Sequence, residues 1–355
     1  MSHKLKQLII LLIRVSNSIK KSGLPNFNDK NAQIIIWAPH FFSLSFLASD
    51  NLQKVLSSYI EIKKSNKKVT IYSKKDIGSF RDKVIIYFGD SRYNIYNFFN
   101  YVNVMHYITN SLVEQGNIVY PKPNEVILWE NKIHMHELFE SLKIRTPKSK
   151  IFDIHNFDFN LISQYPILIK EPHSCSSEGV HKVNNQQELE NLVNNQSFKN
   201  RNKQVVAQEL LNMRSDLRVI LVGDKIEWFY WRKNTSKEWK PTSTGRGGGV
   251  DFNNFPEQWR EWIIQNFKLL NLTSGAFDIA WDGDDYISEP YILEISPFYQ
   301  PNPKPQKEIN LESYGNWKKS LHFKDNYQVA SVNLLFDIQA KVTIEFLNSI
   351  EKKYE

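Results

Sequence analysis

Residues 275–303 read GAFDIAWDGDDYISEPYILEISPFYQPNP and contain two short apolar runs, GAFDIAW and YILEI. Each run holds one acidic residue, Asp278 in the first and Glu294 in the second. Short apolar runs bounded by Gly, Asp and Pro are typical of buried strands. An ionised carboxylate in such a strand costs several kcal/mol unless a cation compensates it. The stretch therefore predicts adjacent strands whose two carboxylates share a metal, rather than a surface hairpin with ordinary acids.

The metal that suits these two residues is magnesium, because both ligands are oxygen donors. The sequence has no Cys/His spacing of the kind that binds zinc. Two acids that face a phosphate-binding loop would form a magnesium–nucleotide site. This interpretation requires a phosphate-binding loop elsewhere in the chain.

A candidate for the loop is PILIKEPHSCSSEGV, residues 166–180, where an apolar strand ends at Lys170 and a run of small residues ends at Gly179. A lysine beside exposed backbone N–H groups presents both a point charge and fixed dipoles to a phosphate chain. The loop lacks the glycines of a P-loop, so no Walker-type site is implied. Taken alone, the pattern is more typical of a solvated surface lysine.

A third segment, QELLNMRSDLRVILVG at residues 208–223, places Asp216 and Arg218 two positions apart in a β-rich run. Residues at this spacing point to the same face of a strand, so an acid and a guanidinium share one surface. A salt-bridged strand face gives the same pattern, and the segment gains weight only beside the two acidic strands.

Composition limits the function less than the motifs do. The 355 residues, 41% hydrophobic and 23% charged, are enough for two or three modest domains. Cys175 is the single cysteine, so no intrachain disulfide forms and a cytoplasmic location is expected. The net charge of +7 favours anionic ligands in general and selects no partner.

The order of these pieces is similar to the ATP-grasp superfamily, and in particular to its carboxylate–amine ligases, such as D-alanine–D-alanine ligase, glutathione synthetase and the ribosomal-protein glutamate ligases. The resemblance covers roughly residues 34–305. It implies an α/β (α+β) fold in which an N-terminal open α/β domain precedes two α+β subdomains that clasp the nucleotide. The expected division is an amphipathic helix (1–30), the α/β domain (31–125), a small subdomain with a lid loop (126–205) and a large subdomain with the metal site and a C-terminal helix (206–355).

The resemblance also implies roles for individual residues. Lys132 and Lys170 match the two lysines that touch the nucleotide phosphates, and the lid over the triphosphate holds Ser174, Ser176, Ser177 and Gly179. The adenine edge would meet Glu209 and the backbone of Leu210 and Asn212, and Asp216 matches the acid that binds the ribose hydroxyls. Asp278 and Glu294 match the carboxylates that hold two Mg²⁺ ions. Arg218 would point toward the acyl acceptor or the reacting phosphate.

The sequence departs from the family pattern at two places. Where the family has an asparagine two residues after the bridging glutamate, this chain has Ser296, so either Ser296 or Asn302 completes the metal site. The lid is rich in serine rather than glycine.

For the γ-phosphate and the charge that develops in the transition state, the candidate is Arg246, with Arg232 and Lys240 as alternatives.

The implied reaction forms an amide from a small-molecule or peptide-like carboxylate and an amine, through an acyl phosphate, with release of ADP and phosphate. A thiol nucleophile at Cys175, beside His173, is disfavoured because both residues lie in the expected lid. Two other functions stay open: a phosphotransferase that acts on an alcohol, and a non-catalytic basic protein that docks on a membrane or nucleic acid. The chain lacks the interleaved basic and aromatic residues of a nucleic-acid binder, so none is expected as a partner.

The N-terminal stretch KLKQLIILLIRVSNSIKK, residues 4–21, has an apolar run too short to span a bilayer. We expect an amphipathic helix that packs on the protein itself or on a partner subunit, as in a homodimer. A weak contact with a membrane surface is the alternative.

Overall fold

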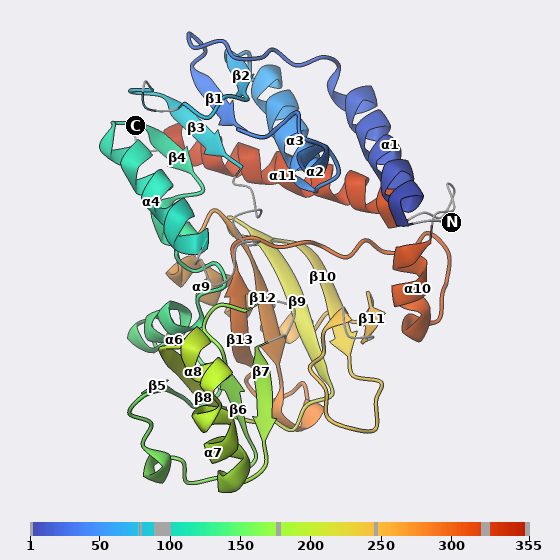
Figure 1. Cartoon of the computed structure of the whole chain (residues 1–355). Helices are drawn as coiled ribbons and strands as arrows, with labels where there is room; N and C mark the ends of the chain where they lie inside the picture. The colour runs from blue at the N-terminus through green and yellow to red at the C-terminus, as the bar shows by residue number, and fades with distance from the viewer. Residues whose placement is uncertain are drawn as a thin grey trace. The chain divides into compact units, whose positions relative to one another are not determined.

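The computed structural model describes residues 3–76, 78, 80–88, 101–174, 179–244, 248–320 and 327–351. The chain forms two compact units, one made of Met1–Val126 with Gln300–Glu355 and the other of Ile127–Tyr299 (Figure 1). The sequence-based division placed residues 300–355 with the large subdomain, whereas the structure groups them with the N-terminal part of the chain.

The first unit contains a parallel four-stranded sheet in the order β2-β1-β3-β4. Its strands are β1 (Ile34–Trp37), β2 (Val69–Tyr72), β3 (Val84–Tyr87) and β4 (Ile118–Tyr120). Its helices are α1 (His3–Ser22), α2 (Leu44–Leu47), α3 (Asn51–Lys64), α4 (Tyr101–Glu114), α5 (Pro123–Val126), α10 (Tyr314–Lys319) and α11 (Tyr327–Glu351). Nearly continuous apolar runs such as IIIW suit strands that are covered on both faces. The expected open α/β domain is confirmed.

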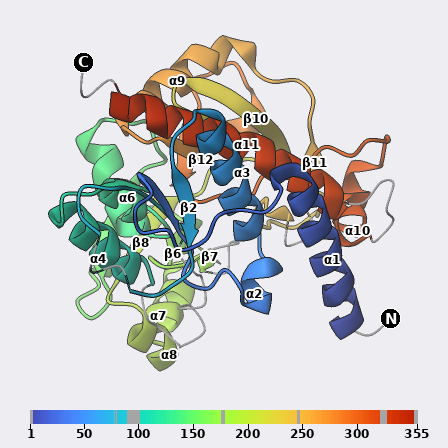
Figure 2. The same cartoon turned by 90° about the horizontal axis from the view of Figure 1, so that it is seen from above.

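The long helix α11 packs against α3 and α1 (Figure 2). Phe336 and Phe346 of α11 are buried in the same core as the strands β1 and β2. Two buried polar contacts also join the helices: Ser57 Oγ donates to the Phe336 carbonyl at 2.6 Å, and the hydroxyls of Ser58 and Thr343 lie 2.9 Å apart. The closing helix therefore completes the core of the N-terminal sheet.

The run YVNVMHYI at residues 101–108 is rich in β-branched and aromatic residues, from which we predict a strand, but in the structure it is the start of helix α4. Its buried positions are Val102, Met105, Thr109 and Leu112, at spacings of three and four residues. That spacing is the period of a helix with one buried face, and it outweighs the strand propensity of the individual residues.

Helix α1 packs on α3 and α11 within its unit, as expected for an amphipathic helix at this end of the chain. Ile13 and Ser18 are buried, and Arg14 donates to Asp50 and to Gln328 Oε1. Over the part of the chain that the structure describes, no helix is both long and apolar enough to cross a membrane.

The second unit holds a five-stranded antiparallel sheet, the large sheet, in the order β11-β10-β9-β12-β13. The strands are β9 (Ser215–Val222), β10 (Lys225–Lys233), β11 (Gly249–Asp251), β12 (Ser274–Ala280) and β13 (Tyr291–Ser296). Helices α6 (Lys132–Ser141) and α9 (Arg260–Leu269) cover one face, where Phe139 and Phe267 join the apolar side chains of the strands.

A four-stranded antiparallel sheet, the small sheet, completes this unit in the order β5-β8-β6-β7. Its strands are β5 (Ser149–Asp153), β6 (Ile167–Lys170), β7 (Val180–Val183) and β8 (Gln204–Glu209), with the helices α7 (Gln186–Asn194) and α8 (Gln196–Arg201). Leu189 and Phe198 from these helices fill its core.

Gly275 in β12 sits where the large sheet meets α9. A Cβ atom there would lie 2.8 Å from Ile295 Cδ1 and 3.0 Å from Phe267 Cε2. We expect Gly275→Ala to destabilise this unit by about 1–3 kcal/mol through overpacking, measured as a lowered midpoint of thermal unfolding. Gly315→Ala is the control, since a Cβ at Gly315 meets nothing within 4 Å. Equal midpoints for the two variants would contradict the packing account.

Candidate active site

The polar face of the large sheet carries one row of facing side chains across four strands. Tyr230 pairs with Arg218, Arg218 with Asp278, and Asp278 with Glu294. Alternate residues such as Leu217 and Phe277 lie in the core on the other face. The period of two therefore brings the predicted Arg218, Asp278 and Glu294 together, although they are far apart in the sequence.

Asp278 is bound by two arginines. Arg218 holds it through two parallel bonds, Nε to Oδ1 at 2.7 Å and Nη2 to Oδ2 at 2.8 Å. Nη2 of Arg232 lies 2.7 Å from the same Oδ2. A two-pronged guanidinium–carboxylate pair fixes the direction of both groups as well as their separation. Asp278, only 4% exposed, is thus held rigidly in the middle of the sheet.

Arg232 also binds Asp216, so the four charges form one chain. Its Nε donates to Asp216 Oδ1 at 2.8 Å, and its Nη2 forms an ion pair with Oδ2. Thr242 adds a hydrogen bond from its hydroxyl to the same Oδ2 at 2.8 Å. Asp216 is 2% exposed, and both its oxygens already accept hydrogen bonds.

Two carboxylates and two guanidiniums compensate one another in this cluster of Asp216, Arg218, Arg232 and Asp278, which we call the arginine–aspartate cluster. Burial by itself would raise the pKa of Asp278, but the guanidiniums of Arg218 and Arg232 hold this pKa below its ordinary value. Asp278 therefore stays ionised where an isolated carboxylate would take up a proton.

Lys170 ends strand β6 of the small sheet and is 9% exposed. Burial lowers its pKa to about 8; Glu294 and Asp278 oppose this shift, while Lys132 adds to it. Charges act on one another in this way only at short range, so the small sheet brings Lys170 to the acids of the large sheet. Within the described residues, the Lys170 ammonium has no hydrogen-bond or ion-pair partner.

Lys132 is the first residue of α6, whose N-terminus is capped by Asn131. Its Nζ donates to the Ser174 carbonyl at 2.6 Å and to Ser174 Oγ at 3.0 Å, and its backbone N–H donates to the Pro172 carbonyl at 3.1 Å. The first lysine is therefore tied to the segment that enters the expected lid.

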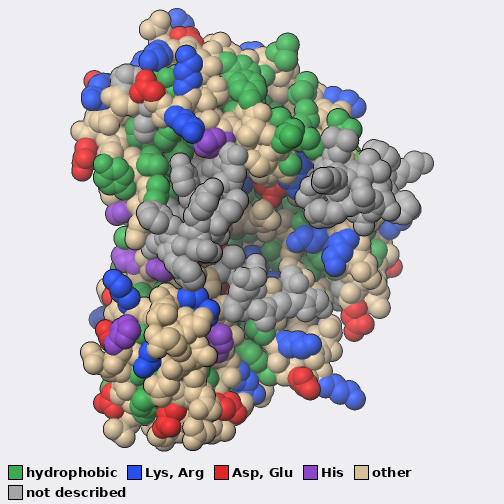
Figure 3. Space-filling view, in the orientation of Figure 1, with side chains coloured by type: hydrophobic (Ala, Val, Ile, Leu, Met, Phe, Trp, Pro, Cys, Tyr) green, Lys and Arg blue, Asp and Glu red, His purple; other side chains and the backbone are tan. Residues whose placement is uncertain are grey.

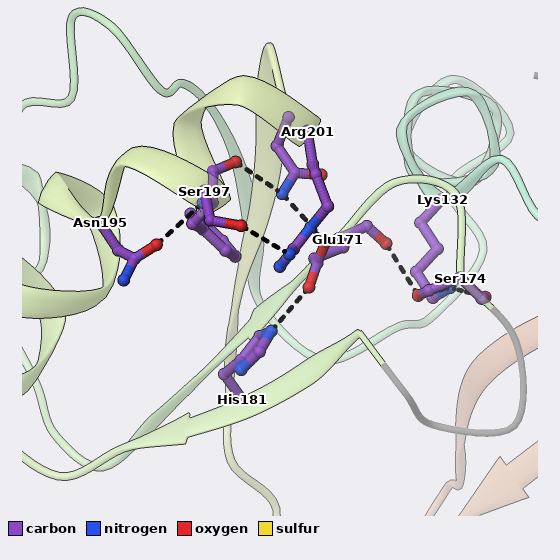
Figure 4. A network of polar contacts seen from close by, with 9 residues as sticks. Lys132, Glu171, Ser174, His181, Asn195, Ser197 and Arg201 are labelled. Atoms are coloured by element: carbon purple, nitrogen blue, oxygen red, sulfur yellow. Dashed lines mark hydrogen bonds and ion pairs between the residues drawn. The ribbon is translucent and has the colours of Figure 1, made fainter. Parts of the chain in front are cut away.

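The stem of that lid is anchored by Glu171 (Figure 4). Its carboxylate accepts from His181 Nε2 at 2.9 Å and from Asn202 Nδ2 at 3.0 Å, while Arg201 Nε lies 3.6 Å away. Its backbone N–H donates to the Gly179 carbonyl at 2.8 Å. The hydrogen bond from His181 and, to a smaller extent, the other contacts hold the pKa of Glu171 below its ordinary value, although burial opposes them.

Gly179 closes the stem at a point with no room for a side chain. A Cβ there would lie 2.5 Å from Ser174 Oγ and 2.8 Å from Glu171 Cβ. Ser174 and Gly179 thus meet at the two ends of the loop, whereas Ser176 and Ser177 lie outside the described residues, as does Cys175.

The segment that joins the two sheets runs from Glu209 to Ser215. Glu209 Oε1 accepts from the Lys148 backbone N–H at 2.9 Å. Both backbone groups of Asn212 are bonded, its N–H to Asp282 Oδ1 at 2.8 Å and its carbonyl to the Gly283 N–H at 2.7 Å. Leu210 is half-buried in the same segment. The adenine contacts expected of Glu209, Leu210 and Asn212 stay a prediction.

The donors available to a metal lie at the β13 end of the polar row. Glu294 faces Asp278 across the strands, and Ser296, two residues on, shares its face and pairs with Ala276. Neither Glu294 oxygen has a hydrogen-bond donor among the described residues. Asp278 Oδ1 accepts one bond and keeps a lone pair, whereas Oδ2 accepts two.

These residues fit magnesium, which binds through one or two carboxylates and completes its shell with phosphate and water oxygens. Over the described chain, no group of three or more His, Cys, Asp or Glu side chains is placed to hold a metal by itself. Asp278, Glu294 and Ser296 would therefore bind the ion only together with the phosphate oxygens of a nucleotide. Asn302, the alternative to Ser296, is buried in the other compact unit.

Other residues of this unit matter more than their sequence context suggested. Arg232 was only an alternative candidate for the γ-phosphate. The alternation of side chains in IEWFYWRK is the signal that could have found it, because it places Arg232 on the same face of the strand as Tyr230. His136 was missed, although its place one helical turn after Lys132 is visible in the sequence. Lys240 is exposed, and its carbonyl accepts from Asn234 Nδ2 at 3.2 Å, while Arg246 lies outside the described residues.

Removing one acid from the arginine–aspartate cluster should destabilise the fold. In Asp278→Asn, two largely buried arginine side chains share the single charge of Asp216, so we expect unfolding in urea to require roughly 3 kcal/mol less free energy. The control is Asp285→Asn, an exposed aspartate that bonds Ser288. If the two variants unfold at the same urea concentration, the cluster does not stabilise the unit.

Comparison with known proteins agrees with this architecture. Residues 129–296 match the family model described as the RimK-like ATP-grasp domain. No protein of curated function matches the sequence at a significant level.

The solved structures that are similar in fold include two ATP-grasp ligases. The D-alanine–D-alanine ligase from Bacillus anthracis, complexed with ATP, is 13% identical, with a TM-score of 0.53 over 89% of this chain and 99% of that chain. The ATP-grasp ligase PsnB, complexed with the precursor peptide PsnA2 and AMPPNP, is 13% identical, with a TM-score of 0.50 over 90% and 99%. The chain thus has the ATP-grasp fold expected from its sequence, and its residues 129–296 match a RimK-like ATP-grasp domain.

Proposed function

We propose that this protein is an ATP-dependent carboxylate–amine ligase that works through an acyl phosphate. The observation that carries the proposal is the convergence of Lys170, Glu294 and Asp278 within electrostatic range in one compact unit. A buried cation without a partner beside carboxylates with free lone pairs is a place for a triphosphate and its metal. The ATP-grasp fold supports this assignment.

The nucleotide roles that we assign follow the contacts of each residue. Lys132 and Lys170 bind phosphate oxygens, and Ser174 and Gly179 close the lid over them. Glu209, Leu210 and Asn212 lie at the adenine. Because both oxygens of Asp216 are bonded to Arg232 and Thr242, we assign it to holding Arg232, in place of the ribose contact that the resemblance implies.

In the proposed reaction, a substrate carboxylate oxygen attacks the γ-phosphorus, and the bond to the β-phosphate breaks to release ADP. The amine then attacks the acyl carbon, loses a proton, and phosphate leaves. Bound magnesium, for which we propose two ions held by Asp278, Glu294 and Ser296, would offset the negative charge of the phosphates.

The chain's own contribution is positioning and charge. Lys170 neutralises a phosphate oxygen. The Arg218 side chain is 18% exposed, and its guanidinium, fixed by Asp278, would face the reacting carboxylate without having to reorganise.

The acid and the amine are small-molecule or peptide-like compounds. ADP release, screened across pooled acids and amines, tests the proposal and separates it from the alternatives. A ligase needs both partners, a phosphotransferase releases ADP with an alcohol alone, and a docking protein releases none. On the face shown in Figure 3, basic side chains are interspersed with acidic ones, which gives little support to docking on a polyanion.

Glu294→Gln should abolish ADP release, with a loss of at least about 100-fold, because the amide keeps the shape of the side chain but loses the charge that faces the metal. The variant should stay folded, since Glu294 has no hydrogen bond to lose among the described residues and gives up only its attraction to Lys170. Full activity in Glu294→Gln would remove the metal assignment.

Nucleotide affinity should fall as the pH rises past 8. The lowered pKa of Lys170, about 8, means that the free protein loses this positive charge above that pH, whereas the phosphates bind the protonated form. We expect the Kd for ADP, measured by calorimetry, to rise about tenfold between pH 7.5 and 9.5. Lys170→Arg stays charged and should show a flat profile; the same rise in that variant would place the titration elsewhere.

A further inference from the structure

His136 is a buried imidazole whose ring makes no hydrogen bond to the described part of the chain. It is 5% exposed, and among the described residues neither of its ring nitrogens has a partner. It lies on α6 one turn after Lys132, between the apolar side chains of Met135 and Phe139 along the chain. An apolar residue at this position would leave no buried polar group unpaired, so the imidazole carries a cost that the free structure does not repay.

The charged neighbours of His136 are the two lysines of the proposed phosphate site. Burial lowers its pKa to about 3, and the charges of Lys170 and Lys132 contribute to the shift. The ring is therefore neutral near pH 7, with one N–H donor and one bare nitrogen. The three basic residues are buried to a similar degree: Lys132 and His136 are each 5% exposed, and Lys170 is 9% exposed.

We propose that His136 is a third phosphate contact of the nucleotide site, whose ring N–H donates to an oxygen of the polyphosphate held by Lys132 and Lys170. The inference rests on the proposed ATP-dependent function.

An anion is the ligand that the surroundings favour. Lys132 is occupied by Ser174, but the Lys170 ammonium has no partner among the described residues, so a ligand that reaches Lys170 brings negative charge close to His136. An oxygen bonded there would satisfy the imidazole N–H and compensate the ammonium together. A neutral donor keeps its proton as the pH rises, so this contact persists where Lys170 loses its charge.

The test compares His136→Leu with the wild-type chain by calorimetric titration of ADP and by thermal unfolding. Leucine fills a similar volume without a donor, so we expect the Kd for ADP to rise tenfold or more, the loss that follows when a hydrogen bond to a charged group is removed. The melting temperature without nucleotide should stay equal or rise, because two unpaired nitrogens disappear. A purely structural histidine would not weaken binding while leaving stability intact.

Two further variants sharpen the result. His136→Gln keeps an N–H donor and should recover part of the affinity. His134→Leu makes the same substitution on a partly exposed site of α6, where the ring lies 3.9 Å from Glu137, and should bind ADP like the wild-type protein.

The inference is overturned if His136→Leu binds ADP as tightly as the wild-type chain, or if it weakens binding only by unfolding the protein while His136→Gln recovers nothing. If the wild-type chain binds no ADP at all, the proposed function fails and the phosphate contact fails with it.

Discussion

The two-pronged ion pair between Arg218 and Asp278 is the interaction on which the site depends. It lies in the middle of the large sheet, where β9 and β12 are neighbours, and it keeps a buried carboxylate ionised. The pair takes one lone pair on each oxygen of Asp278 and Arg232 takes the second on Oδ2, so that one lone pair of Oδ1 is left for a metal. Glu294, which faces Asp278 across the strands, has two oxygens without a hydrogen-bond donor among the described residues, whereas Asp278 is held in a fixed orientation.

The small sheet adds the opposite charge at a cost. Burying Lys170 lowers its pKa from the ordinary value to about 8, a shift that an anionic ligand would reverse. Among the described residues, the Lys170 ammonium and the neutral His136 ring leave their hydrogen bonds unmade, which is expected of a site organised before its ligand arrives. The contacts of Glu171 with His181 and Asn202 anchor the segment that enters the expected lid.

Much of the fold could be predicted from residue patterns, because an acid within a buried apolar strand requires a cation nearby to compensate its charge. Asp278 and Glu294 were found in this way. The prediction failed at residues 101–108, where strand propensity hid a helical spacing, and the contribution of the closing helix to the N-terminal core left no signal in the local pattern. Arg232 was underestimated because its importance comes from two partners, Asp216 and Asp278, which lie 16 and 46 positions away.

The sequence by itself determined which side chains share a face, since periods of two and 3.6 are set by the backbone and are legible in one dimension. It could not determine which oxygens of those side chains are free. Whether Asp216 meets a ligand or an arginine, and whether His136 finds a partner, depends on groups that other strands and helices bring near. Only the tertiary structure decides this, because hydrogen bonding and desolvation act through distances that chain separation does not encode.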